Sequence, residues 1–132
     1  GPGGGTTRLA KYLQLAGRFD EAMDEIKVLL DDGKEWAACM FSHQPPKLQW
    51  LHMAARAARI HRDAVLICKR EKNEKLRLRH ETAAELYAEK SKNLDEVSRE
   101  ISAKRRRAWE EATANGPDAI ADFLRKRQAG EI

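Results

Sequence analysis

Two cysteines and two histidines are the residues of this chain best suited to binding a metal ion. Cys39 and His43 are four residues apart. His61 and Cys68 are seven apart, so each pair would share one side of a continuous helix. If the two helices met, the four side chains would suit a tetrahedral zinc site. Because no C-x-x-C or H-x3-H pair accompanies them, we favour a small apolar role for both cysteines. We predict no metal and no other cofactor.

Recognisable catalytic motifs are missing from the sequence. It has no glycine-rich phosphate loop, no nucleophile elbow and no paired-carboxylate motif. A cysteine–histidine pair stays open, because such partners are brought together only by the fold. His52, His61 and His80 lie among basic residues and are expected to be solvated. We predict a protein without enzymatic activity.

Positive charge is concentrated in the second part of the chain. Residues 1–47 hold six Lys and Arg against seven Asp and Glu, whereas residues 48–132 hold nineteen against fourteen. Several basic residues lie four positions from a glutamate, and in two pairs, Glu71 with Lys75 and Glu100 with Lys104, the glutamate comes first, which is the favoured orientation. This arrangement is typical of a solvated helix with ion pairs along its surface.

Nucleic acid is the alternative partner that the basic residues indicate. The candidate phosphate contacts are arginines in two short runs, namely Arg56, Arg59 and Arg62, and Arg105, Arg106 and Arg107. The first run forms a cationic stripe on a helix, and Trp109 lies close to the second run for base stacking. The intervening glutamates would repel phosphate, and no helix-turn-helix or RNA-binding signature is present. Nucleic-acid binding is therefore the second hypothesis.

The elements that carry these residues are predicted to be helices. From Lys47 to Ala114 there is no proline or glycine, and the strongest helix formers dominate. This arm is either one helix or a hairpin, with a turn at 71–74 where Asn73 takes the left-handed conformation. In the first helix, the predicted apolar face consists of Leu9, Tyr12, Leu13 and Ala16.

An all-α fold follows from this pattern. We predict one helical domain over residues 8–132, with helical hairpins first, then a long charged helix or helical hairpin, then a short C-terminal helix. The short helices occupy 8–46, the arm 47–114 and the last helix 117–129. Residues 1–7 are glycine-rich and are expected to be a flexible leader or expression scar.

The first third of the chain carries a distinctive helical-hairpin pattern. It consists of Leu9-Ala10-Lys11-Tyr12, then Ala16-Gly17-Arg18-Phe19-Asp20-Glu21-Ala22, then Ile26 and Leu29-Leu30. This pattern resembles a tetratricopeptide-repeat hairpin, mainly over residues 8–32. A second copy with fewer matching positions runs from Ala64 through Asn73 to Leu86. The resemblance implies stacked helix pairs whose concave face binds peptides or partner proteins.

Two groups of apolar residues are the predicted partner contacts, the first of them provided that it is not covered within the chain. Tyr87, Leu94 and Ile101 recur at seven-residue spacing with Val97 between them, which indicates a seam that packs along a partner helix. We call these four residues the apolar seam. Trp36, Phe41 and Trp50 flank Pro45-Pro46 and are the candidate walls of a peptide pocket, as aromatic anchors dominate many interfaces.

The predicted function is a non-enzymatic adaptor or assembly module. It would bind another protein, or a second copy of itself, through these helical surfaces. No apolar run approaches the roughly 20 residues that a membrane-spanning helix needs, so we predict no membrane partner. With two cysteines in apolar helical contexts and no secretory signal, the expected location is the cytoplasm.

Overall fold

The chain is built from helices alone over residues 6–132, the part that the computed structural model describes. The described residues contain no strand, and this confirms the predicted all-α fold. The seven helices are α1 (Arg8–Leu15), α2 (Phe19–Asp31), α3 (Gly33–Met40), α4 (Pro46–Arg70), α5 (Glu74–Lys90), α6 (Leu94–Asn115) and α7 (Pro117–Gln128).

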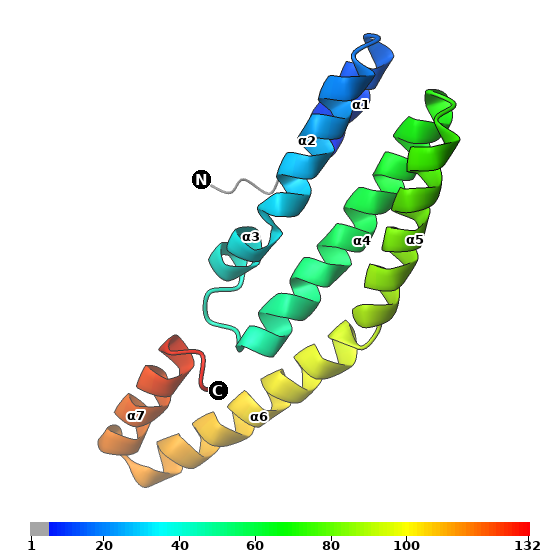
Figure 1. Cartoon of the computed structure of the whole chain (residues 1–132). Helices are drawn as coiled ribbons and strands as arrows, with labels where there is room; N and C mark the ends of the chain where they lie inside the picture. Colours follow the sequence, from blue (N-terminus) through cyan, green and yellow to red (C-terminus); the bar gives the residue numbers. More distant parts are fainter. Residues whose placement is uncertain (1–5) are drawn as a thin grey trace.

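Three helical hairpins follow one another along the chain (Figure 1). α1 and α2 form the first, α4 and α5 the second, and α6 and α7 the third. The predicted arm therefore folds back on itself at 71–74, and a second turn at Ser91–Asn93 bends α6 away from α5. α4 is the central element, because it contacts α1, α2, α3, α5 and α6.

The main core lies where the first hairpin meets α4. Small residues such as Ala10, Ala22 and Ala64 are fully buried and let the helix backbones approach closely. Ile26 and Ile67 fill the space between them. Two larger side chains of α1 stay outside this core. Of the predicted apolar face of the first helix, Leu13 packs against this core, whereas Leu9 and Tyr12 are more than half exposed.

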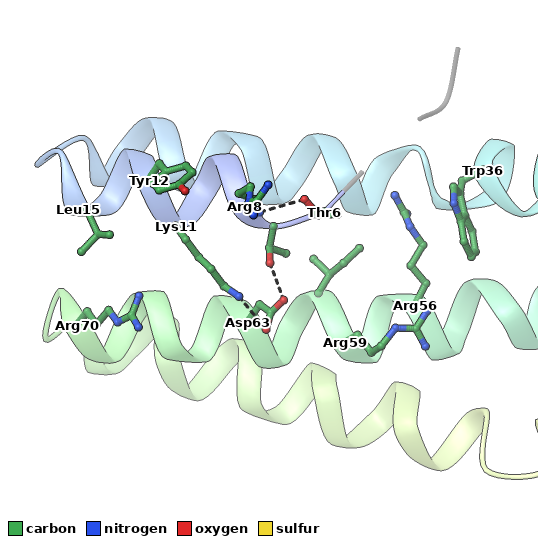
Figure 2. A pocket seen from close by; sticks show the side chains of 12 residues that line it. Thr6, Arg8, Lys11, Tyr12, Leu15, Trp36, Arg56, Arg59, Asp63 and Arg70 are labelled. Atoms are coloured by element: carbon green, nitrogen blue, oxygen red, sulfur yellow. Dashed lines mark hydrogen bonds and ion pairs between the residues drawn. The ribbon is translucent and has the colours of Figure 1, made fainter. Parts of the chain in front are cut away.

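At least one residue of the predicted leader is part of the fold. Residues 1–5 lie outside the described residues. Thr7, in contrast, is buried, and its hydroxyl donates to the Asp63 carboxylate on α4 at 2.6 Å (Figure 2). The expectation of a flexible leader is therefore wrong for Thr7, because this hydrogen bond ties it to α4.

Three helices end with a residue in the left-handed conformation. Gly17 (φ 77°) and Gly130 (φ 75°) take this role after α1 and α7. After α4 the residue is Lys72 (φ 59°) and not the predicted Asn73. The amide of Asn73 donates to the carbonyl of Cys68 at 2.9 Å, and that of Lys72 to Lys69 at 3.0 Å. These two bonds form the Schellman motif that ends a helix.

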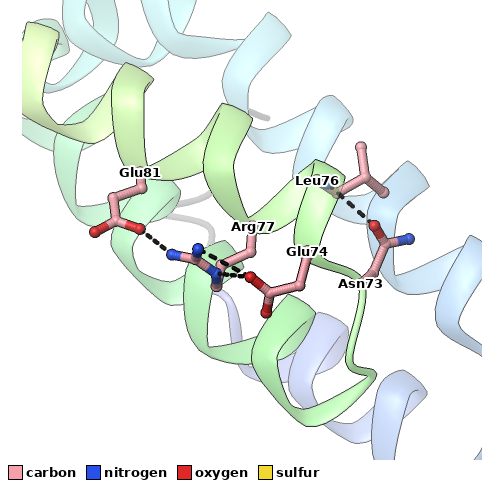
Figure 3. A network of polar contacts seen from close by, with 5 residues as sticks. All are labelled: Asn73, Glu74, Leu76, Arg77 and Glu81. Carbon is pink, nitrogen blue, oxygen red and sulfur yellow. Dashed lines mark hydrogen bonds and ion pairs between the residues drawn. The ribbon is translucent and has the colours of Figure 1, made fainter.

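Asn73 instead begins the next helix. Its side-chain oxygen accepts from the Leu76 amide at 3.0 Å, which is the usual N-cap hydrogen bond (Figure 3). One turn further, Arg77 donates to Glu74 at 2.9 Å and also pairs with Glu81 (Figure 3). Because these ion pairs are partly solvated, the cap contributes more to the turn than they do.

Removing the cap should destabilise the protein measurably. Asn73→Ala is expected to lower the free energy of unfolding by about 1 kcal/mol, since the Leu76 amide loses its acceptor. Urea unfolding followed by circular dichroism measures the change. Asn73→Asp keeps the acceptor and is the matched control. Equal stability of the Ala and Asp variants would contradict the capping role.

Candidate functional site

An open groove of about 750 Å³ separates α1 from α4 and extends to Trp36 on α3 (Figure 2). We call it the α1–α4 groove. Basic side chains dominate its lining, with a single carboxylate among them. They are Arg8 and Lys11 from α1, and Arg56, Arg59 and Arg70 from α4, against Asp63.

Asp63 is already neutralised by its neighbours. One carboxylate oxygen accepts from Thr7, and the other lies 3.6 Å from the Lys11 ammonium. Arg8, Arg59 and Arg70 have no ion-pair partner among residues 6–132. The groove therefore presents three positive charges that the described part of the chain does not balance. Such a surface attracts a negatively charged partner.

Apolar surface lies beside these charges. Tyr12 and Leu15 line the groove from α1, and their side chains are 61% and 67% exposed. Ile60 on α4 is buried and forms part of the groove wall. Exposed aromatic and aliphatic side chains next to arginines suit a partner that brings both acidic and apolar groups.

Arg56 is structural and not a phosphate contact. It is only 5% exposed, and its guanidinium donates to the Leu29 carbonyl at 2.8 Å. It also lies 3.1 Å from the Asp32 carboxylate and 4.7 Å from the centre of the Trp36 ring. Arg56 was predicted to contact phosphate. This prediction is wrong, because α2 and α3 bury its guanidinium group.

The predicted arginine stripe on α4 is divided between different surfaces. Arg59 faces the α1–α4 groove, whereas Arg62 lines a separate hollow between α4 and α5. In the second run, Arg105 and Arg106 line a hollow between α6 and α7, and Arg107 is exposed. A spacing of three residues does not keep Arg56, Arg59 and Arg62 on one surface, because five other helices contact α4.

The apolar seam is used within the chain. Val97 is buried against Leu48 and Leu51 of α4, and Leu94 and Ile101 pack beside it. Tyr87 stacks on His61 of α4, with ring centres 5.8 Å apart. The seam does not face a partner as predicted, because α4 already covers much of these side chains.

The predicted aromatic pocket does not form as one site. Trp36 is buried and meets the edge of Phe41, with ring centres 5.7 Å apart. Phe41 stacks in turn on His52 at 3.7 Å. Trp50 is exposed and lines a different hollow, with Lys34 and Met53. Only Trp50 keeps the exposure that a peptide anchor needs.

The candidate zinc ligands do not converge. Cys39 is exposed, whereas Cys68 is buried beside the sulfur of Met23 at 3.9 Å. Burial raises the pKa of the Cys68 thiol, which makes it a poor nucleophile. Over residues 6–132, no group of three or more His, Cys, Asp or Glu side chains is placed to hold a metal ion.

Two of the histidines that were expected to be solvated form a pair. The Nδ1 atoms of His61 and His80 are 2.9 Å apart, so one ring donates a hydrogen bond to the other. Burial and the neighbouring His80 lower the pKa of His61 to about 4, and burial lowers the pKa of His80. The pair joins α4 to α5. The expectation of solvated side chains was wrong because these helices meet at this position.

No protein-family model matches this sequence, and no significant match was found among curated proteins or solved structures. The resemblance to tetratricopeptide repeats stays a prediction. α1 and α2 form a hairpin with Gly17 in the turn, but such hairpins occur in many all-α folds.

Among residues 6–132, no helix combines the length and apolarity that crossing a membrane requires.

Arg8, Tyr12 and Arg70 were not predicted as groove residues. A signal for them was present in the first helix, where Leu9, Tyr12, Leu13 and Leu15 occupy more than one helix face. A helix of eight residues cannot bury all four against one neighbour. Arg70 carried no comparable signal, because its place opposite α1 depends on how the two hairpins pack.

Proposed function

We propose that this chain is a non-enzymatic protein-interaction module that binds an acidic, amphipathic segment of a partner protein in the α1–α4 groove. The observation that carries the proposal is the arrangement of Arg8, Arg59 and Arg70 around the exposed side chains of Tyr12 and Leu15. Carboxylates of the partner would pair with the arginines, and its apolar residues would cover Tyr12 and Leu15.

The length of the groove suits a short segment. Arg59 and Arg70 are eleven positions apart on one helix, which corresponds to about 16 Å. A partner helix of about three turns would span this distance. Its acidic residues would need to recur every three or four positions to reach both arginines from one face.

Nucleic acid fits this groove less well than an acidic peptide. The groove combines its arginines with aliphatic surface, whereas a nucleic acid offers phosphates and flat bases but no aliphatic side chains. The exposed Leu15 offers no stacking surface for a base. A peptide can place an apolar side chain on Leu15 and carboxylates at the arginines.

Two potential nucleophiles, Cys68 and Ser91, are engaged in other contacts. Cys68 is buried next to Met23, and Ser91 donates its hydroxyl to the Tyr87 carbonyl. Within residues 6–132, neither is hydrogen-bonded to a histidine. His61 and His80 are occupied with each other.

Selection of peptides on the protein tests the proposal. From a displayed library of 16-residue peptides, we expect enrichment of sequences with Asp or Glu every three or four positions beside Leu or Phe. Binding of a selected peptide is then measured by fluorescence anisotropy. Arg59→Glu and Arg70→Glu should each weaken it about tenfold or more, because each places like charges in contact.

Arg62→Glu is the matched control. Arg62 is also an exposed arginine on α4, but it lines the hollow against α5 and not the groove. Its reversal should change peptide affinity less than about threefold. Equal losses for Arg59→Glu and Arg62→Glu would mean that only the general positive charge attracts the peptide. No enrichment of acidic residues would also contradict the proposal.

A further inference from the structure

A second basic hollow, of about 510 Å³, lies in the α6–α7 hairpin. We call it the α6–α7 hollow. It differs from the α1–α4 groove because its lining includes no carboxylate. Its charged and apolar side chains are Arg105, Arg106 and Trp109 from α6, and Phe123, Leu124 and Arg127 from α7.

The nearby acidic residue is already paired with other cations. Asp122 accepts from Lys126 at 3.0 Å and from Arg125 at 3.3 Å. Arg125 also lies 3.7 Å from Glu131. Arg106 and Arg127 have no ion-pair partner in the described part of the chain. The positive charge of the hollow is therefore left for an external anion.

The positive charges of Arg105 and Arg127 repel each other when no anion is bound near them. Burial and the charge of Arg127 lower the pKa of Arg105. The Nε atom of Arg105 is buried and has no hydrogen-bond partner within residues 6–132. An anion bound near the two guanidinium groups would offset this repulsion.

The remaining nitrogens of Arg105 hold the hollow in place. One donates to the Gln44 side chain at 3.0 Å, and the other donates to the His43 carbonyl. Gln44 and His43 belong to the connection between α3 and α4. These bonds fix α6 to the rest of the chain, so the site is formed before a ligand arrives.

An aromatic surface completes the hollow. Trp109 packs against the buried Phe123, with ring centres 5.4 Å apart and planes inclined by 55°. Trp109 nevertheless remains 42% exposed. A supported but exposed indole beside arginines is the arrangement that proteins use to stack a nucleobase and pair its phosphate.

We propose that the α6–α7 hollow binds single-stranded nucleic acid, with a base stacked on Trp109 and its phosphate held by Arg106 and Arg127. This site is separate from the α1–α4 groove and does not depend on the proposed peptide binding. Of the predicted nucleic-acid contacts, Arg105 and Arg106 belong to this site, whereas the arginines of α4 do not. A purely acidic peptide would use the arginines alone, whereas a nucleotide would use both the arginines and the indole.

Binding of fluorescein-labelled dT12 and rU12 tests this site. Anisotropy titrations at several salt concentrations between about 50 and 200 mM give the affinity and its salt dependence. Trp109→Ala should weaken binding about tenfold, the effect of one lost base–aromatic stack. Trp109→Phe, which keeps an aromatic face, should retain most of the affinity.

Arg127 provides a test that does not disturb packing. Arg127→Gln removes no ion pair within residues 6–132, whereas Trp109→Ala also removes a contact with Phe123. It should reduce the slope of log affinity against log salt by about 0.7, the value for one lost phosphate contact on a single strand. Arg125→Gln is the matched control, because Arg125 is on the same helix but does not line the hollow.

Three results would overturn the proposal. The first is no binding of dT12 or rU12 at 50 mM salt. The second is an equal effect of Arg125→Gln and Arg127→Gln, which would indicate attraction by general charge. The third is a twelve-residue polyglutamate peptide that binds as tightly as dT12 and is unaffected by Trp109→Ala. That last outcome would make the hollow an acidic-peptide site.

Discussion

Arg56→Ala is expected to lower the free energy of unfolding by about 3 kcal/mol. The buried guanidinium joins three helices, because it donates to the Leu29 carbonyl, pairs with Asp32 and covers Trp36. Its removal leaves the Leu29 carbonyl without this donor and the partly buried Asp32 without its counter-ion. Breaking a buried pair in this way costs about 3–5 kcal/mol, and the partial exposure of Asp32 favours the lower end.

Urea unfolding of two further variants isolates the role of Arg56. Arg59→Ala removes an exposed arginine one turn along α4 and should change stability by less than about 0.5 kcal/mol. Arg56→Lys keeps the charge but cannot reach Leu29, Asp32 and the Trp36 ring together, so it should be intermediate. If Arg56→Ala unfolds at the same urea concentration as Arg59→Ala, the buried pair contributes nothing.

Acidification between pH 6.5 and 4 should destabilise the protein through the His61–His80 pair. Both histidines have lowered pKa values in the folded chain, so the unfolded chain binds more protons in this range. Stability is therefore fully present above about pH 6.5 and is lost as the pH falls. For His61, a change from 6.5 to about 4 corresponds to about 3 kcal/mol.

The geometry explains why protonation is unfavourable. The two Nδ1 atoms are 2.9 Å apart, and a hydrogen bond between them needs one bare nitrogen. Two charged rings would place hydrogens and positive charge against each other. His61 is only 9% exposed and stacks on Tyr87, so water cannot readily stabilise its charge.

Unfolding curves at pH 7.5, 6.0 and 5.0 measure this dependence. His80→Gln should flatten the loss of stability with pH, because one titrating partner is gone. His43→Gln removes an exposed histidine outside the pair and should leave the dependence unchanged. Parallel pH profiles for the wild type and His80→Gln would show that His80 takes no part in the acid sensitivity.

The helices could be predicted from the sequence because their signals are local. Gly17 and Gly116-Pro117 mark helix ends, and the long run without proline or glycine becomes α4, α5 and α6. Such signals depend on residues a few positions apart. The turn at Ser91–Asn93 was missed, since it contains neither glycine nor proline.

The candidate sites were harder to predict because they depend on contacts between helices. A period of 3.6 shows that Tyr87 and Val97 lie on an apolar face, but it cannot show that α4 covers that face. Arg56 has the sequence context of an exposed arginine and is buried because α2 and α3 pack over it. The meeting of His61 and His80 depends likewise on the register between α4 and α5.

The order of the three hairpins has a consequence for how quickly the native state is reached. Each hairpin pairs helices that are neighbours in the chain, so the loops that must close are short and their entropic cost is small. Proteins dominated by local contacts of this kind fold in about microseconds to milliseconds. After α4 has paired with α5, the first and third hairpins can pack against α4. The chain thus acquires its long-range contacts last, when most of its conformational entropy has already been lost.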